Sequence, residues 1–419
     1  MTEIQKKIKL VAIVLGGTAT HIELVMNLKN RGYYVLLIDY LDSPPALKFC
    51  DHHIQESTLE KDRVLAIAKE FQAELVVSTS VDQANATAAY VSEFLSLPSF
   101  YSHQTAITVS DKIKMKHFLK ANNIPSAGFF TLEKEEEIHN RGLNYPLVVK
   151  PVDTTGSKGV FKIEGDEDFL IRIEESKSYS KSGRLLVEEF IEGEEIQCDF
   201  FVIDGIPHFL MDRKKLKPII TENKVLQSVG SVIPSGSFNN VIDQVKTIAT
   251  NIASSLNIKA TPLFIQCIVK NEKVYVLEFA LRIGGGLSAA LLSLVNGFDF
   301  VNASINALLG KEIDIKYKEL KRMYSTLLIY ASEGVFEMVT GLEKVDAHRL
   351  AEKTFVLKAV GNKTSSKLMS SDRIVSFVIS GSNLKEINHK KKKILNLIDV
   401  LDNNGKSIII VDREFTSNI

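Results

Sequence analysis

The sequence predicts an α/β protein that begins with an open, parallel β-sheet. Three short apolar runs read as buried strands, and a helical pattern follows each of them. The runs are 10–15, 34–38 and 75–78, and the helical patterns are 20–30, 59–71 and 83–95. Strands that alternate with helices of roughly 10–15 residues form right-handed βαβ units, which build such a sheet.

Ligands of an open parallel sheet bind beyond the carboxyl ends of its strands. Here those ends carry Gly16, Asp39 and the segment 79–82. An acid about 20 residues beyond a glycine turn is half of a dinucleotide-binding fingerprint. The other half, G-x-G-x-x-G, is missing, because residues 16–21 read G-G-T-A-T-H. A nicotinamide oxidoreductase is therefore an alternative, and the favoured interpretation is a Rossmann-like domain that only shares the turn.

Length and composition limit the class of protein. The 419 residues suggest about two to four domains, and 45% hydrophobic with 24% charged residues is ordinary for a globular chain. Lys plus Arg and Asp plus Glu both total 51, so no net charge attracts nucleic acid or acidic membranes. We expect neither as a partner.

Three further observations predict a cytoplasmic protein. Cys50, Cys198 and Cys267 are too few and too far apart for a disulfide framework or a metal cluster. Residues 1–9 lack the apolar region of a signal peptide. No apolar run reaches the ~18–20 residues that cross a bilayer.

From about residue 111 the pattern changes to α+β with antiparallel hairpins. Ser110 is expected to cap a helix that runs to about Ala121. Strands are expected at 146–151, 185–187, 200–203, 207–211, 264–269 and 274–279. The last segment, from about 324, is expected to contain strands at 325–330, 374–379 and 407–411 and a helix at 384–401. The basic run 389–393 is interpreted as an exposed face of that helix.

The first candidate site motif is Lys150 with the loop 154–159, which is rich in glycine and hydroxyl groups. An ammonium beside backbone N–H groups can bind phosphate oxygens. Alone, the same pattern fits an ordinary surface hairpin.

The second motif is the acidic segment 188–195. Its strand end can offer backbone groups to an adenine, and Glu195 can offer a carboxylate to a ribose. Alone, it fits a solvated acidic turn.

The third motif joins two strands across a short turn at 271–272. Gln266 and Glu278 are separated by an even number of residues, so pairing across the hairpin places both on one face. Oxygen ligands on one face suit Mg²⁺. Arg282 follows four residues later and can offset charge on a transferred phosphoryl group.

Together these motifs resemble the ATP-grasp superfamily. They are Lys150 with its loop, V-E-E-F-I-E-G-E-E at 187–195, and Q-x11-E-x3-R-x-G-G-G from Gln266. The resemblance is closest to the carboxylate–amine (amino-acid) ligase branch, with biotin carboxylase and carbamoyl-phosphate synthase domains as relatives. It implies a Rossmann-like (preATP-grasp) domain at 1–110, an ATP-grasp module at 111–323 with a lid at about 124–190, and a small C-terminal α+β domain at 324–419.

The resemblance also implies roles for individual residues. The ATP-binding set is Lys112, Lys150, Thr154, Thr155, Gly156, Ser157, Gly159, Glu188, Phe190, Ile191 and Glu195. The metal ligands for Mg²⁺, or Mn²⁺, are Glu278 and Gln266. The catalytic residues are Lys150 and Arg282, and Arg282 would stabilise an acyl phosphate. Candidate substrate contacts are Arg213, Arg282, Gly284 and Gly285. For the basic cluster 212–217 a solvated loop is the alternative.

Two positions depart from the family pattern. Many members have a glutamate where this chain has Gln266, and the usual third metal ligand, an asparagine, is replaced by Ala280. One metal could then be weakly held, or completed by water, phosphate or another side chain. A catalytically silent nucleotide-binding relative is therefore an alternative.

The activity that the resemblance implies is ATP-dependent amide formation between a small carboxylic acid and an amine, through an acyl phosphate. An amino acid or derivative is the expected acid. A bicarbonate-activating, carboxylase-like enzyme is the second alternative. Family members are often dimers, so a homodimer is compatible with the resemblance.

Overall fold

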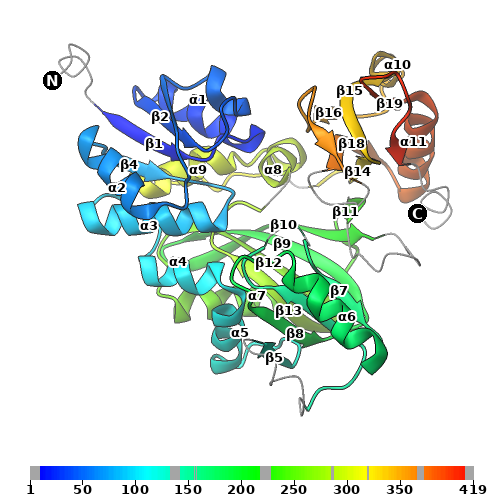
Figure 1. The fold of residues 1–419 in the computed structure, drawn as a ribbon, viewed down its shortest axis with the longest axis horizontal. Coiled ribbons are helices and arrows are strands. Elements are labelled where there is room, and N and C mark those ends of the chain that lie inside the picture. The colour runs from blue at the N-terminus through cyan, green and yellow to red at the C-terminus, as the bar shows by residue number, and fades with distance from the viewer. Residues whose placement is uncertain are drawn as a thin grey trace.

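The computed structural model describes residues 10–132, 142–154, 156, 158–217, 228–284, 287–318, 320–365 and 372–410. These residues form a mixed α/β fold, as the sequence predicts, with a nine-stranded sheet at its centre. Figure 1 shows the N-terminal sheet and the C-terminal strands on opposite sides of the molecule, and several of the C-terminal strands belong to the nine-stranded sheet.

The N-terminal sheet is parallel, with strand order β3-β2-β1-β4. Its strands are β1 (Val11–Leu15), β2 (Tyr34–Asp39), β3 (His52–Gln55) and β4 (Leu75–Val77). The apolar runs of β1 and β2 are buried on both faces, which explains why they are continuous. The sequence analysis missed β3, because this edge strand is polar and half-exposed.

Helices cover both faces of this sheet. One face packs against α2 (Lys61–Glu70) and α3 (Asp82–Leu95). The other packs against α1 (Ile22–Asn30) and against α8 (Ser288–Asn296) and α9 (Phe300–Leu308), which come from much later in the chain. Through α8 and α9 the N-terminal sheet shares a core with the central sheet.

Two helices connect the N-terminal sheet to the next region, α4 (His103–Ser110) and α5 (Lys112–Ala121). The predicted cap was wrong: Ser110 ends α4, and the carboxylate of Asp111 caps α5 by accepting hydrogen bonds from the backbone N–H groups of Ile113 and Lys114. The error arises because a single residue separates the two helices.

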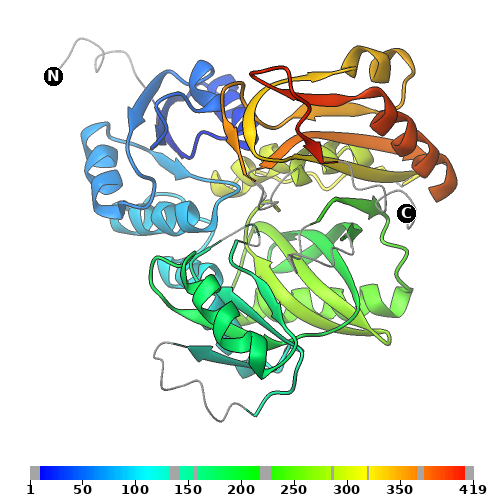
Figure 2. The same cartoon turned by 45° about the vertical axis from the view of Figure 1, so that its right-hand side comes forward.

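The predicted lid region contains a small antiparallel sheet of order β5-β8-β6-β7. The strands are β5 (Phe129–Leu132), β6 (Leu147–Pro151), β7 (Phe161–Ile163) and β8 (Leu185–Glu189), and α6 (Asp166–Lys177) packs on them. Figure 2 shows this lobe below the N-terminal sheet and beside the central one. Residues 133–141 of the predicted lid lie outside the described residues.

The central sheet begins with four antiparallel strands in the order β13-β12-β9-β10, followed by β11. Their bounds are β9 (Glu194–Ile203), β10 (Ile206–Leu216), β11 (Gly230–Ile233), β12 (Thr261–Lys270) and β13 (Lys273–Ala280). The amphipathic helix α7 (Asn239–Ser255) buries one face of this sheet. Asn271 and Glu272 form the predicted turn with positive φ angles of 49° and 60°.

The sheet continues into the C-terminal region, because β14 (Met323–Ala331) pairs with β11. The other elements there are β15 (Gly334–Thr340), α10 (Leu342–Ala347), β16 (Lys353–Val356), β17 (Lys363–Thr364), β18 (Arg373–Gly381), α11 (Leu384–Leu397), β19 (Asp399–Asp402) and β20 (Ile409–Ile410). The predicted domain boundaries stay predictions, and this pairing places the last two regions in one sheet.

Two C-terminal predictions were wrong. The helix predicted to reach residue 401 ends at Leu397, because Asp399–Asp402 pairs as a strand with β15. The run 389–393 is not wholly exposed, since Lys391 is 3% exposed on the inner face of α11. Position 411 of the last predicted strand lies outside the described residues.

Among the described residues, no single helix has the length and apolar composition to cross a membrane. Helices α8 and α9 meet these criteria only as a pair, which is bent by 111°. The three cysteines are free, and Cys198 and Cys267 are buried.

Candidate functional site

One face of the central sheet carries a row of polar side chains. The antiparallel register places Arg213 of β10, Gln197 of β9, Gln266 of β12 and Glu278 of β13 directly beside one another. Residues opposite each other in antiparallel strands share a face. The pairing of Gln266 with Glu278 that the even spacing predicts is confirmed.

Glu195 lies one row away on the same face of β9, where it contacts several groups. The side-chain amide of Gln266 donates a hydrogen bond to its carboxylate. Lys217 forms an ion pair with it, and the Lys215 ammonium lies 3.4 Å from it. Burial opposes ionisation, but the two lysines outweigh burial, so the pKa of Glu195 is lowered. The carboxylate predicted to bind ribose is therefore already held by a basic pair from β10 and the residues after it.

A second buried carboxylate, Glu188 of β8, bridges two lysines. One oxygen pairs with Lys116 of α5, and the other pairs with Lys150 of β6. Burial raises the pKa of Glu188, and the two ammonium groups lower it by more, so the net pKa is below the ordinary value. The side chain of Glu188 thus orients Lys150, and any contact of this segment with adenine would fall to its backbone.

Sequence reasoning missed Lys116, which is 1% exposed. A usable signal was present, because Lys116 follows Lys112 by four residues and so lies on the same face of α5. Lys215 belongs to the basic cluster 212–217 of the sequence analysis, and it shares a face of β10 with Arg213 because it follows that residue by two positions.

Lys112 lies at the start of α5 and donates a hydrogen bond to the backbone oxygen of Thr154. Burial lowers the pKa of this lysine. The predicted phosphate-binding loop is thus joined to the predicted phosphate-binding lysine. Gly156 and Gly159 have φ angles of 69° and 70°, in the region that favours glycine. Two predicted loop residues, Thr155 and Ser157, lie outside the described residues.

Phe190 and Ile191 follow directly after β8. The backbone N–H of Phe190 donates to the oxygen of Pro146 at 2.9 Å, and the Lys162 ammonium lies 4.4 Å from the centre of its ring. Ile191 is partly exposed. No contact in the described part of the chain brings either side chain to the polar row, and their roles stay predictions.

Arg282 leaves the end of β13 and reaches the N-terminal region. Its Nε and Nη2 atoms donate to the two carboxylate oxygens of Asp82 at 2.5 and 2.6 Å. Its guanidinium carbon lies 5.1 Å from the centre of the Phe264 ring. Burial opposes the charge, but Asp82 outweighs burial, so the pKa of Arg282 is raised. The sequence analysis placed the segment 79–82 at the ligand-binding end of the N-terminal sheet, but it did not predict that Asp82 contacts Arg282.

The predicted substrate contacts form a buried polar group. Arg213 donates to the hydroxyl of Ser288, and a Cβ at Gly284 would come 2.6 Å from that hydroxyl and 2.7 Å from Nε2 of Gln197. Any side chain at position 284 would therefore collide with these residues. Arg213 is 7% exposed inside β10, which contradicts the interpretation of this residue as part of a solvated loop. Gly285 lies outside the described residues.

The residues at the hairpin have donor atoms that suit a Mg²⁺ ion. Gln266 donates its amide N–H to Glu195, which leaves the amide oxygen to coordinate beside the Glu278 carboxylate. Ala280 is 3% exposed and lies opposite Phe264, so this neighbouring position offers no oxygen. The described residues hold no group of three or more His, Cys, Asp or Glu side chains that could bind a metal alone. Water and phosphate would have to complete the coordination.

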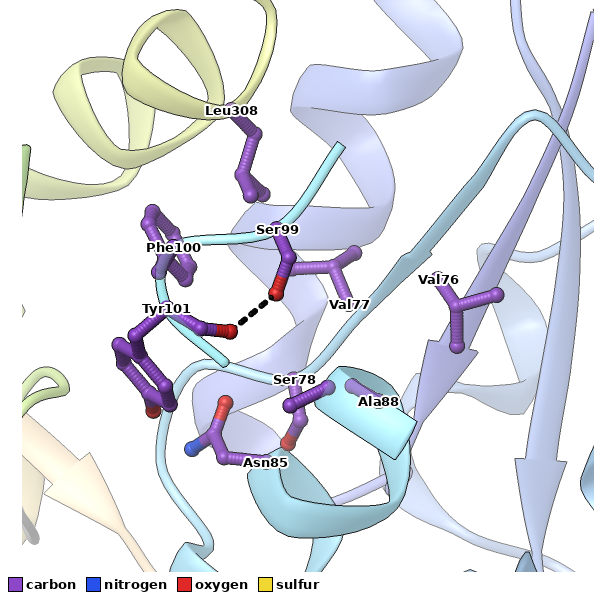
Figure 3. A pocket seen from close by; sticks show the side chains of 10 residues that line it. Val76, Val77, Ser78, Asn85, Ala88, Ser99, Phe100, Tyr101 and Leu308 are labelled. Atoms are coloured by element: carbon purple, nitrogen blue, oxygen red, sulfur yellow. Dashed lines mark hydrogen bonds between the residues drawn. The ribbon is translucent and has the colours of Figure 1, made fainter. Parts of the chain in front are cut away.

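A small, mostly apolar pocket lies elsewhere, in the N-terminal region. Its walls come from β4, α3, the segment 99–101 and Leu308 of α9 (Figure 3). The Ser99 hydroxyl donates to the backbone oxygen of Tyr101 at 2.8 Å and braces this segment. None of the predicted site residues lines the pocket.

Comparison with known proteins finds an ATP-grasp domain and relatives among the ligases. Residues 143–290 match the model of the ATP-grasp domain. An L-arginine-specific L-amino acid ligase of Bacillus subtilis is 23% identical over 351 residues, which are 80% of this chain and 82% of that protein. A D-alanine–D-alanine ligase of Prochlorococcus marinus is 33% identical over 99 residues, which are 21% of this chain and 28% of the ligase. The crystal structure of an L-amino acid ligase from Bacillus licheniformis superposes with a TM-score of 0.77 at 20% identity, and the match covers 95% of this chain and 100% of that one.

The chain thus carries an ATP-grasp domain and is a relative of the ATP-grasp carboxylate–amine ligases, as its motifs predict. Within that class, the two amino-acid ligases are similar to it over most of its length, whereas the D-alanine–D-alanine ligase matches a short segment.

Proposed function

We propose that the protein is an ATP-dependent ligase that joins a small carboxylic acid, an amino acid or derivative, to an amine and releases ADP and phosphate. The observation that carries the proposal is the polar row on the central sheet, where Glu278 lies beside Gln266 and close to the lysine-paired Glu195. Burial lowers the pKa of Lys112, Lys116 and Lys215, and the Glu278 carboxylate opposes this for each of them. The same carboxylate acts on Arg282. A polyanion with a divalent cation suits such a site.

The reaction has two balanced steps. An oxygen of the substrate carboxylate attacks the γ-phosphorus of ATP, the bond to the β,γ-bridging oxygen breaks, and ADP leaves. The amine nitrogen then attacks the acyl carbon and loses a proton, and phosphate leaves with the electrons of the broken C–O bond. Neither step needs covalent catalysis by the protein, so positioning and charge neutralisation supply the rate.

The chain's own residues fit these tasks. Lys112 and Lys150 would neutralise phosphate oxygens, and Arg282 would offset the charge of the acyl phosphate. Glu278 and the Gln266 amide oxygen would hold Mg²⁺ or Mn²⁺, which supplies further positive charge when bound. Arg213, with Gly284 beside it, would bind an anionic substrate group. Closure of the lid over the phosphates would protect the acyl phosphate from water.

The experiment measures ADP and phosphate release from MgATP with pooled amino acids, small carboxylates and amines, followed by mass spectrometry of the product. Release that requires both an acid and an amine, with an amide product, supports the ligase. Release with bicarbonate alone would support the carboxylase-like alternative. Nucleotide binding without release from any pool would support a silent relative.

A variant ties the activity to the site. Glu278→Gln is expected to lower turnover by about 10³-fold or more, because it removes the only carboxylate of the predicted ligand pair. Glu272→Gln, in the turn of the same hairpin, is the matched control and should keep full turnover. Equal activity of the two variants would contradict the metal role of Glu278. The homodimer and the cytoplasmic location stay predictions.

A further inference from the structure

The strand end that carries Arg282 is held on both sides of this residue by the N-terminal region. The backbone N–H of Ile283 donates to the oxygen of Thr79 at 3.1 Å. The hydroxyl of Tyr101 donates to the oxygen of Leu281 at 3.1 Å. Figure 3 shows Tyr101 on the segment after α3, which also lines the small pocket. The backbone on either side of Arg282 is therefore anchored to another part of the fold.

The side chain of Arg282 is anchored to the same region. Asp82, the first residue of α3, accepts from Nε and Nη2 in a two-point ion pair. Nη1 donates to the backbone oxygen of Ile283 at 2.9 Å. The side chains of Arg282 and Asp82 are only 12% and 16% exposed. Each of the three guanidinium nitrogens thus donates one of these hydrogen bonds. Within the described residues, the second N–H groups of Nη1 and Nη2 make no further hydrogen bond.

This arrangement matters because of the arginine's flexibility. A guanidinium on a long side chain gains catalytic power only when it is oriented before the charge develops. A two-point carboxylate contact fixes both the position and the plane of the guanidinium. Asp82 belongs to α3 of the N-terminal region, whereas Arg282 follows the last strand of the hairpin with Gln266 and Glu278. The orientation of Arg282 thus depends on how the N-terminal region docks.

We propose that Asp82 is a positioning residue, which holds Arg282 in the orientation that stabilises a phosphoryl group in transfer. The inference rests on the proposed function. It assigns a role to the N-terminal region, whose Asp82 orients an arginine of the catalytic centre on the central sheet. Asp82 acts through Arg282 and needs no contact with substrate.

The experiment compares the affinity of the full-length protein for MgADP alone and for MgADP with aluminium fluoride, a mimic of the transferred phosphoryl group. The wild type is expected to gain about tenfold or more in affinity when the fluoride is added. Arg282→Ala and Asp82→Ala should each lose this gain and keep the affinity for MgADP alone. The double variant should lose no more than either single variant.

Two further variants separate positioning from general support. Asp82→Asn keeps the shape of the side chain and removes its charge, and it should also lose the gain. Arg31→Ala breaks bonds to Asn302 and Asn306 that join α1 to α9, elsewhere between the N-terminal region and the later chain. It should keep the gain. If Arg31→Ala loses as much as Asp82→Ala, or if Asp82→Ala keeps the gain, the positioning role is wrong.

The proposed function fails in a different way. A wild type that binds MgADP but gains nothing from aluminium fluoride, and releases no ADP with any acid and amine, overturns the ligase. It also overturns the positioning role, because Arg282 then has no phosphoryl group to meet. A gain that depends on Arg282 but not on Asp82 overturns the positioning role alone.

Discussion

Two buried lysines in this chain have opposite surroundings. Lys116 is 1% exposed in the predicted ATP site, and its ammonium pairs with the Glu188 carboxylate. Lys391 is 3% exposed in the C-terminal region, between Ile387 and Ile394 on the inner face of α11. Among the described residues its ammonium has no hydrogen-bond partner. Burial lowers the pKa of both, and that of Lys391 falls to about 8.

The difference shows that burial alone does not identify a functional lysine. Lys116 shares the Glu188 carboxylate with Lys150. The position of Lys150 in the predicted site therefore depends on this ion-pair network. At Lys391 burial is the one cause of the shift, and no charged neighbour contributes to it. We infer that the first lysine is retained as part of a charge network, while the second is a cost to stability that packing of α11 tolerates.

The largest expected effect comes from breaking the network. Glu188→Gln leaves two ammonium groups close together without their shared counter-ion, and we expect a loss of about 3–5 kcal/mol in the free energy of unfolding. Urea unfolding measures it. Glu189→Gln, one residue on and partly exposed, is the control and should change stability by less than about 0.5 kcal/mol. Equal losses in both variants would mean that the ion pairs of Glu188 contribute nothing specific.

A smaller effect, of opposite sign, is expected at Lys391. With a pKa of about 8 in the folded chain and about 10.4 when unfolded, the unfolded chain binds more protons between these values. The contribution of Lys391 to wild-type stability therefore rises from pH 8 to about 10.4 and is constant below pH 8. At neutral pH the penalty is about 3 kcal/mol, and Lys391→Met should remove it.

The measurement is urea unfolding of the wild type and Lys391→Met at pH 7 and pH 10. The stability difference between the two proteins should shrink at the higher pH. Lys392→Met, on the exposed side of α11, is the matched control and should shift little at either pH. A wild type that is more stable than Lys391→Met at pH 7 would show that Lys391 has a counter-ion in solution.

The same contrast explains how much the sequence could predict. Periodic apolar patterns predicted β1, β2, β4 and their helices, because burial on both faces leaves a clear signal. Polar edges such as β3 leave none. The basic run 389–393 looked solvated from its composition, and only packing in three dimensions shows that one of its lysines is buried.

For the candidate site, local motifs predicted individual residues, but they predicted a partner only where a short hairpin brings two residues together. Gln266 and Glu278 could be paired from sequence, because a short hairpin fixes the register. Asp82 lies 200 positions from Arg282, and no local pattern predicts a contact at that separation. Arg213 was identified as a candidate from sequence. Its burial depends on the length of β10 and on the contact with Ser288, and neither could be predicted from a local pattern.

The smallest expected effect concerns Ala280, where a polar side chain would lie beside the Glu278 carboxylate. Ala280 follows Glu278 by two residues on β13, so an asparagine there would share its face. We expect Ala280→Asn to lower the Mg²⁺ concentration for half-maximal turnover by about threefold, because one more oxygen ligand completes the coordination. Ala280→Leu, which adds similar bulk without oxygen, is the control for crowding against Phe264. If Asn and Leu change the Mg²⁺ dependence equally, crowding explains the effect, and water and phosphate already satisfy the metal.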